Sequence, residues 1–258
     1  MAFYDLPKAE RTKLALKIRQ EIASDLEAGK LDNIKRYASD DDTYIRKNAY
    51  LALGKLYHER QSLQDKIFSV LTKLFIDKDE KIRQTAVYAF GEIGKMEAEK
   101  VLGFFEAALN DEHRSVRNAV VGSLKQMGQA NPKPTIKFAK KSLRHPDPLV
   151  RQAIIHGIEL RGRTHPADIL PLLAELQNDP DSRVRKRLVH VLSQISYKRG
   201  CLEKVVAELK RWENKKLVER AIEEILDVHK RYKNFSAKSY EEAKEYIKSH
   251  LQRNHLGI

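Results

Sequence analysis

The chain has 258 residues, of which 41% are hydrophobic and 33% are charged, and its formal net charge at pH 7 is +13. This composition has too many apolar residues for an intrinsically disordered chain and too many charges for a membrane-embedded one. Apolar runs are shorter than the roughly 18 residues that a membrane span requires, and charges interrupt the start of the chain where a secretion signal would be apolar. We therefore expect a soluble, cytoplasmic protein.

Residues 6–38 contain the first predicted elements. Their pattern predicts a long amphipathic helix and a shorter one that follows it. Together these helices would cap the N-terminal end of the elements that come after them.

An apolar residue followed by arginine recurs through the next part of the chain and marks an internal repeat. These pairs begin at Ile45, Ile82, Val116, Val150 and Val184. Their separations are 37, 34, 34 and 34 residues, and a further 34 residues lead to Val218, where Glu219 replaces the arginine. A period of this length is typical of stacked helix pairs. We refer to the six apolar residues as markers.

Each marker is predicted to lie near the start of the second helix of a pair. Apolar residues follow it four and eight positions later, a spacing that keeps one helical face buried. Three positions before it stands a residue suited to cap the helix. These residues are Asp42, Asp79, His113, Asp147 and Asp181. First helices are predicted at residues 64–75, 98–109 and 169–176, and Gly94, Gly128 and Gly162 are predicted to end second helices as C-caps.

The recurring arginine lies in the first helical turn, where the helix dipole disfavours a cation. Aspartates five positions before the markers, at Asp40, Asp77, Asp111 and Asp179, are available as partners in the same or a neighbouring repeat. We interpret the arginines as a structural ladder and not as ligand contacts. The ladder residues are Arg46, Arg83, Arg117, Arg151 and Arg185.

A last helix is predicted at residues 236–251. The chain is thus expected to consist of N-terminal capping helices (1–38), a repeat array (39–230), and a C-terminal capping helix and tail (231–258). No segment alternates with period two for long enough to form a sheet. The predicted fold class is all-α, a right-handed α–α superhelix of about six helix pairs.

The segment DEKIRQTAVYAFGEIG at residues 79–94 resembles HEAT repeats of the short, bilin-lyase-like class, and the resemblance extends over residues 40–228. It implies an armadillo-type helical solenoid that acts as a scaffold for protein or nucleic-acid partners. The segments DPDSRVRKRLVHVLSQI (179–195) and AELKRW (207–212) more weakly resemble the HEAT-like alkylpurine DNA glycosylases, which hold duplex DNA in a basic groove. That family relies on tryptophans, whereas this chain has one, Trp212, which we expect in the core. The resemblance therefore implies DNA binding without the glycosylase reaction.

Positions two and six residues after each marker should line the concave face of such a stack. In the first five repeats they are occupied by Lys47, Gln84, Asn118, Gln152, Lys186, Leu51, Tyr88, Gly122, His156 and His190. None of these is acidic, so the face can approach phosphates or a peptide backbone without like-charge repulsion. The alternative is a solvated helix face without function.

Positive charge is concentrated in residues 131–200, which contain 14 Lys or Arg and six Asp or Glu. This excess of +8 suggests a polyanion or an acidic protein as partner, and the alternative is a surface that only aids solubility. One basic stripe, Lys137, Lys140, Lys141 and Arg144, is expected on the outer face. A second group is expected to form one patch that follows a phosphate backbone. It comprises Arg161, Arg163, Arg183, Lys186, Arg187, Lys198 and Arg199, which join Lys47, Gln152, His156 and His190 as predicted binding residues.

Catalytic motifs are absent from the sequence, which has no glycine-rich phosphate loop, nucleophile elbow or His-Glu-x-x-His. His156 and His190 lack further ligands at suitable spacing, so we expect no metal and no other cofactor. The lone Cys201 rules out an internal disulfide. The leading hypothesis is a non-enzymatic protein that binds nucleic acid. The alternatives are a scaffold for an acidic protein or peptide, and a DNA-repair protein similar to the glycosylases; a monomer is the simplest expectation.

Overall fold

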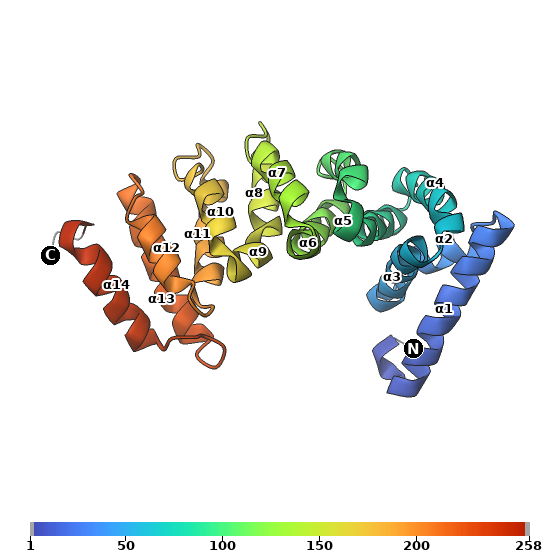
Figure 1. Ribbon diagram of the computed structural model, residues 1–258, viewed down its shortest axis with the longest axis horizontal. Coiled ribbons are helices and arrows are strands. Elements are labelled where there is room, and N and C mark those ends of the chain that lie inside the picture. The colour runs from blue at the N-terminus through green and yellow to red at the C-terminus, as the bar shows by residue number, and fades with distance from the viewer. Residues whose placement is uncertain (1–2, 256–258) are drawn as a thin grey trace. The chain divides into compact units, whose positions relative to one another are not determined.

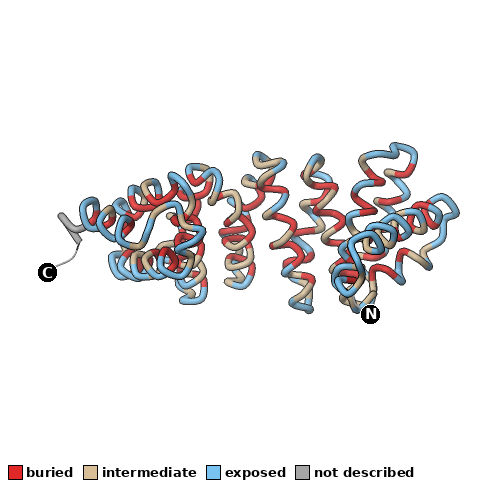
Figure 2. Tube along the Cα trace, turned by 90° about the horizontal axis from the view of Figure 1, so that it is seen from below, coloured by how far each residue is buried: buried red, intermediate tan, exposed pale blue. Residues whose placement is uncertain are grey.

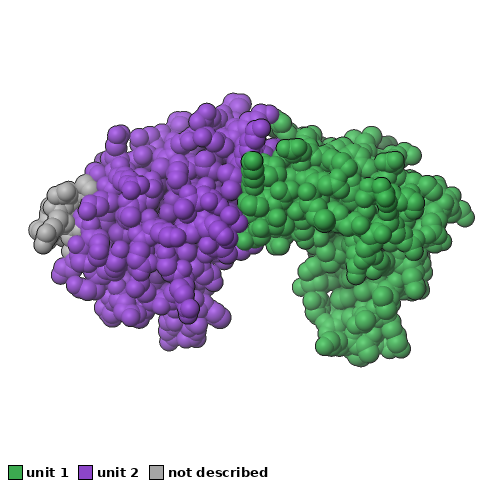
Figure 3. All heavy atoms as spheres, viewed as in Figure 1, with its two compact units in different colours: residues 1–134 green, residues 135–258 purple. Residues whose placement is uncertain are grey.

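The computed structural model describes residues 3–255, and side chains within residues 3–251. Over that range the secondary structure is helical and contains no strand, which confirms the predicted all-α class. The chain divides into two compact units, unit 1 (residues 1–134) and unit 2 (residues 135–258) (Figure 3). The three-part division expected from the sequence remains a prediction.

Unit 1 contains α1 (Lys8–Ala28), α2 (Asp32–Ala38), α3 (Thr43–Glu59), α4 (Gln64–Phe75), α5 (Glu80–Ala108) and α6 (Arg114–Ala130), with short 3-10 helices at Phe3–Asp5 and Gln61–Leu63 (Figure 1). The two predicted N-terminal helices correspond to α1 and α2. Helix α5 consists of two helices joined at Glu97, whose φ of −123° and ψ of 56° are not helical. Its first part is therefore the second helix of one pair, and its last part is the first helix of the next.

Unit 2 contains most of α7 (Pro132–Ser142), then α8 (Pro148–Gly157), α9 (Glu159–Thr164), α10 (Pro166–Ala174), α11 (Ser182–Ser196), α12 (Leu202–Leu209), α13 (Lys215–Arg231) and α14 (Tyr240–His255). Helix α14 begins four residues later than predicted because Ser239 and Glu242 form a capping box. The Ser239 amide donates to the Glu242 carboxylate at 2.7 Å, and the Glu242 amide donates to the Ser239 hydroxyl at 3.2 Å.

Six consecutive helix pairs follow one another along the described residues, in agreement with the predicted number. Within unit 1 the second helices α3, α5 and α6 contact one another in order, as α8, α11 and α13 do within unit 2. Buried residues form a stripe along the helices, whereas the loops are mostly exposed (Figure 2). The core residues predicted four and eight positions after the first five markers are all buried.

The predicted caps are confirmed in five repeats. Each cap side chain accepts a hydrogen bond from the amide two residues later, at 2.7 Å for Asp42, Asp79 and Asp181 and at 2.8 Å for Asp147. His113 does the same through Nδ1 at 3.4 Å. Because a capped amide fixes where the helix begins, these residues also fix which side chains face the core and which face outward.

The sixth repeat is displaced by one residue from its predicted register. Its cap is Asn214, whose side chain accepts from the Leu217 amide at 3.1 Å. Leu217 is therefore the sixth marker, and the prediction of Val218 was wrong. The core positions four and eight residues later are Ala221 and Ile225, which are fully buried. A constant spacing could not reveal this shift because the start of the helix is set by its local cap, Asn214, and not by the period.

Two of the three glycines predicted as C-caps have a packing role instead. Among the described residues only Gly29 and Gly200 have positive φ, so Gly94, Gly128 and Gly162 are not left-handed caps. A Cβ atom on Gly94 would lie 2.6 Å from Met127 Cε, and one on Gly162 would lie 2.4 Å from Ile195 Cδ1. At these two positions a Cβ atom would clash, so glycine lets the second helix of the next repeat pack directly against the backbone.

Candidate functional site

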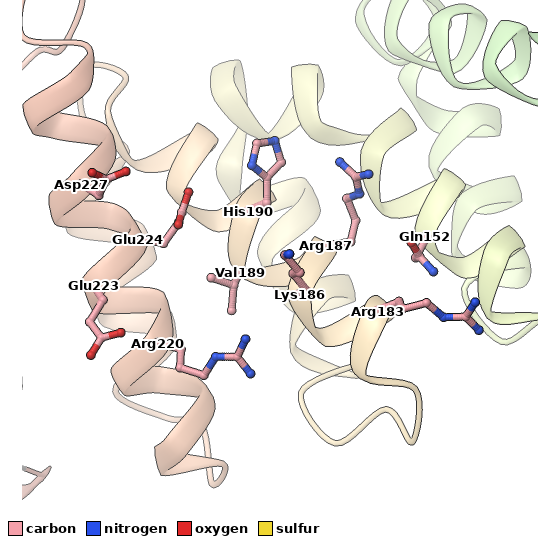
Figure 4. A pocket seen from close by; sticks show the side chains of 10 residues that line it. All are labelled: Gln152, Arg183, Lys186, Arg187, Val189, His190, Arg220, Glu223, Glu224 and Asp227. Carbon is pink, nitrogen blue, oxygen red and sulfur yellow. The ribbon is translucent and has the colours of Figure 1, made fainter.

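A pocket with a volume of about 690 Å³ lies on α8, α11 and α13 of unit 2. We call it the unit 2 pocket. Its lining residues are Gln152, Arg183, Lys186, Arg187, Val189, His190, Arg220, Glu223, Glu224 and Asp227 (Figure 4). Five of the predicted binding residues meet here: Gln152, Arg183, Lys186, Arg187 and His190.

Helical spacing explains how these side chains reach one surface. On α11, Arg183, Lys186, Arg187 and His190 stand at spacings of three and four residues, so they share a face. Val184 and Leu188, on the opposite face, are fully buried and hold α11 in the stack. The Asp181 cap sets this register.

Helix α13 supplies the other wall in the same way. Arg220, Glu223, Glu224 and Asp227 have the same spacing of three, four and seven residues, and the Asn214 cap places them on the pocket side. Arg220 extends from α13 toward α11 (Figure 4). The sequence analysis did not predict this wall, because its lining positions cover only the first five repeats. The expected lining without acidic residues does not hold in the sixth repeat, which contributes three carboxylates.

Several charged groups of the unit 2 pocket already have partners. Arg183 pairs with its own helix cap Asp181 at 2.7 Å, and the hydrogen bond from Arg183 lowers the pKa of Asp181 to about 2. Arg231 pairs with Glu224 at 3.0 Å and with Asp227 at 2.5 Å. These pairs reduce the charge that the groups involved can offer to a ligand.

The remaining charged groups leave an excess of cations. Within the described residues, Lys186, Arg187 and Arg220 form no side-chain hydrogen bond or ion pair. Among the lining carboxylates in that range, Glu223 alone also lacks such a partner. Burial lowers the pKa of His190, so its imidazole is neutral at pH 7. Because the single charge of Arg231 can balance only one of Glu224 and Asp227, the unit 2 pocket presents three unpaired cations against two remaining negative charges, an excess of one cation.

Three other predicted binding residues are engaged elsewhere in the fold. Arg163 donates to Glu159 at 2.5 Å and to Gln194 at 2.7 Å. Arg161 pairs with Asp168 at 2.5 Å, and His156 Nε2 lies 3.5 Å from Glu159. Glu159 is almost completely buried at the start of α9, and sequence reasoning missed it. Its position four residues before Arg163 was the available signal.

Lys198 and Arg199 line a separate pocket of about 210 Å³, together with the buried His229 and Lys238. Lys47 lies in unit 1, in a pocket of about 270 Å³. The predicted single basic patch is thus divided within unit 2 between two pockets and a set of internal ion pairs. Spacing along the sequence could not show this division, because the partner of each arginine depends on which carboxylate lies near it in the folded chain.

All five ladder arginines donate to backbone carbonyls at the start of their own repeat, and two of them also pair with a carboxylate. Arg83 donates to both oxygens of Asp111 at 2.8 and 3.1 Å, and Arg151 donates to both oxygens of Asp179 at 2.7 and 2.8 Å. Each of these carboxylates belongs to the next repeat and is one of the aspartates that the sequence analysis considered as partners. The remaining ladder residues, Arg46, Arg117 and Arg185, donate to backbone carbonyls at the start of their own repeat.

In the part of the chain that the structure describes, no group of three His, Cys, Asp or Glu side chains is arranged to hold a metal ion. Cys201 is buried, and burial raises the pKa of its thiol. Trp212 is buried, as expected. No helix among the described residues is both long and apolar enough to cross a membrane.

Two family models match parts of the chain. Residues 27–111 match non-SMC mitotic condensation complex subunit 1, and residues 136–226 match HEAT repeats. No curated protein sequence matches significantly.

Solved structures that share the fold include the following two. AlkD2 from Streptococcus mutans is 16% identical, with a TM-score of 0.54, and the alignment covers 79% of this chain and 97% of AlkD2. The N-terminal domain of MAST/Orbit is 17% identical, with a TM-score of 0.53, over 77% of this chain and 97% of that domain. At these identities the likeness concerns the fold alone.

Proposed function

We propose that this HEAT-repeat protein binds the phosphodiester backbone of nucleic acid through the unit 2 pocket. Its repeats are those that the sequence predicted, and residues 136–226 match the HEAT model. The pocket lies within this matched segment except for Asp227.

One observation carries the proposal: Lys186, Arg187 and Arg220 line a single pocket without partners among the described residues. A phosphate backbone offers a row of negative charges, and each cation that contacts a phosphate releases counterions and so adds to the affinity. The pairing of Glu224 and Asp227 with Arg231 lowers the repulsion that these carboxylates would exert. Neutral His190 and Gln152 add hydrogen-bonding groups at the same surface.

The test is a titration of the protein with labelled duplex DNA, duplex RNA and single strands at several salt concentrations. About three phosphate contacts predict a slope of log K against log salt of about −2.7 for duplex DNA. The variant K186A/R220A should weaken binding and flatten the slope by about two. A matched control, K137A/K140A, also removes two exposed cations, but from α7, and should keep the wild-type slope.

Absence of binding at low salt, or binding that does not change with salt, would remove the proposal. Equal loss of affinity in K186A/R220A and K137A/K140A would show that overall charge, and not the unit 2 pocket, attracts the nucleic acid. Methylated duplex DNA is included among the substrates, and we expect no release of free base.

An acidic peptide or protein is the second candidate because the same three cations would attract its carboxylates. Glu223 favours such a partner over a uniform polyanion, since a peptide can place a basic side chain beside it. Purification from a nuclease-treated lysate separates the two candidates. A partner that survives nuclease and is lost with K186A/R220A would favour the peptide.

A further inference from the structure

The pocket that contains Lys47 lies between α3 and α5 of unit 1, and we call it the unit 1 pocket. It is lined by Thr43, Tyr44, Arg46, Lys47, Tyr50, Gln84, Thr85 and Tyr88. Three of these side chains are aromatic, and all the others are polar or basic, with no acidic residue among them. Its chemistry therefore differs from that of the unit 2 pocket.

Two of the tyrosines form a fixed aromatic wall. The rings of Tyr50 and Tyr88 stack with their centroids 4.9 Å apart and an interplanar angle of 24°. Tyr88 also lies against Gly122 of α6, where a Cβ atom would come within 2.9 Å of its ring. Burial raises the pKa of Tyr50 to about 12, so its hydroxyl stays neutral and does not repel an anion.

The aromatic surface continues from this wall to solvent. Tyr44 is 41% exposed and contacts Tyr4, which is 56% exposed, with ring centroids 4.1 Å apart. The guanidinium of Arg11 lies 4.8 Å from the centre of the Tyr4 ring. Exposed aromatic rings interleaved with cations are typical of surfaces on which nucleobases stack.

Lys47 supplies the charge that such a surface needs for a phosphate. It is exposed, one helical turn from Tyr44 and Tyr50, and within the described residues it has no ion-pair partner. Arg46 is different because its guanidinium donates to the carbonyls of Asp40 and Asp41 and to Gln84. The unit 1 pocket thus combines aromatic rings with one available cation.

We infer that the unit 1 pocket takes an unpaired nucleobase, with the neighbouring phosphate on Lys47, so that the chain prefers single-stranded to duplex nucleic acid. The inference rests on the proposed function. In a duplex both faces of each base are covered by neighbouring bases, whereas a single strand can place a base against tyrosine rings.

The experiment compares two strands of equal length and charge, an oligothymidylate and its fully abasic counterpart. The wild-type protein should bind the strand with bases about tenfold more tightly, since one stacked base contributes about 1–3 kcal/mol. The variant Y44L/Y50L should reduce this ratio to about one without changing the affinity for the abasic strand. Y50F, which keeps the ring, should retain the wild-type ratio.

F235L provides a matched control because Phe235 is 75% exposed and lies in unit 2, outside both pockets. Thermal unfolding of each variant checks that it is folded. A wild-type ratio of one, or a ratio that Y44L/Y50L leaves unchanged, overturns the inference while the proposed function stands. Failure to bind either strand overturns both, and K186A/R220A should weaken both strands equally.

A protein occupant is the competing outcome. An acidic peptide that carries tryptophan is therefore labelled and titrated as a ligand in its own right. If it binds through Tyr44 and Tyr50 under conditions where the oligothymidylate does not, the pocket belongs to a protein partner and the inference is wrong.

Discussion

The pockets of unit 1 and unit 2 use the same positions of the repeat for different chemistry. Directly before the marker, unit 1 has Tyr44 where unit 2 has Arg183, and two positions after it both have a lysine, Lys47 and Lys186. Five positions after the marker, a tyrosine in unit 1 corresponds to Val189 in unit 2. The scaffold is repeated, but the pocket lining is not.

This difference shows that two sets of residues act independently in each repeat. The cap, the core residues and the ladder arginine fix where a helix begins and which face it buries. Most lining positions lie outside that framework, with the ladder residue Arg46 as an exception, so they can vary between an aromatic and a cationic surface without altering the fold. The framework should therefore respond alike to mutation in both units, whereas the pockets should respond differently.

The largest expected effect is on the framework. R151A should lower the free energy of unfolding by about 3–5 kcal/mol because it leaves the buried carboxylate of Asp179 without its partner. R83A should have a similar effect in unit 1 through Asp111. R185A should cost about 1 kcal/mol because that arginine donates to a backbone carbonyl. Urea unfolding measures all three. Equal effects for R151A and R185A would contradict the expectation that the pair between Arg151 and Asp179 adds to the stability.

A smaller difference between the units is expected at their packing glycines. G162A should destabilise by about 1–2 kcal/mol because its Cβ would meet the branched Ile195, which cannot easily move. In G94A the Cβ would meet the flexible end of Met127 at 2.6 Å and Cγ2 of the branched Val101 at 2.8 Å, so the gain in helix propensity of about 1 kcal/mol should offset only part of the clash and leave a smaller loss than in G162A. Melting temperatures of the two variants test this order, and a greater loss in G94A would reverse it.

The two pocket lysines should differ in the ligand that each affects. K186A should lower the affinity for strands with and without bases by about fivefold and reduce the salt slope by about one. K47A should lower the affinity only for the strand that carries bases, because its phosphate contact depends on a base held by the tyrosines. Fluorescence anisotropy with the two strands measures both effects. If K47A and K186A changed the affinities for the two strands alike, the proposed difference between the pockets would be wrong.

The smallest expected effect concerns pH and unit 2. Burial lowers the pKa of His229, which is 1% exposed, so the folded chain keeps this imidazole neutral. The unfolded chain binds a proton at the ordinary pKa of about 6.5, and it therefore takes up more protons than the folded chain as the pH falls below that value. Stability is lost in that range. H229Q should show a smaller difference in unfolding free energy between pH 7.5 and 5.5, and an unchanged difference would exclude His229 as the cause.

Much of the fold was predictable because helix caps, core spacing and the repeat period are local features of the chain. Asp42, Asp79, Asp147 and Asp181 each cap a helix through an amide two residues away, and no distant residue is needed to recognise them. The sixth repeat differs from its predicted register because its cap, Asn214, stands one residue before the position that the period of 34 gives.

The candidate site was predictable only in part. The sequence predicted that Lys186 and Arg187 belong to one basic patch, and the structure adds Arg220 and the acidic residues of α13 to the pocket that contains them. Which arginines remain available was not predictable, since Arg161 and Arg163 are held by Asp168 and Glu159.

The sequence by itself determined the helical repeats, their caps and the carboxylates offered to Arg83 and Arg151. Only the tertiary structure decided how the remaining charges are paired, where the pockets lie, and that Tyr44 lines a pocket of unit 1 at the position where Arg183 lines one of unit 2. The physical reason is range: helix formation depends on residues within a turn or two, whereas an ion pair or a pocket depends on side chains from separate repeats meeting in space.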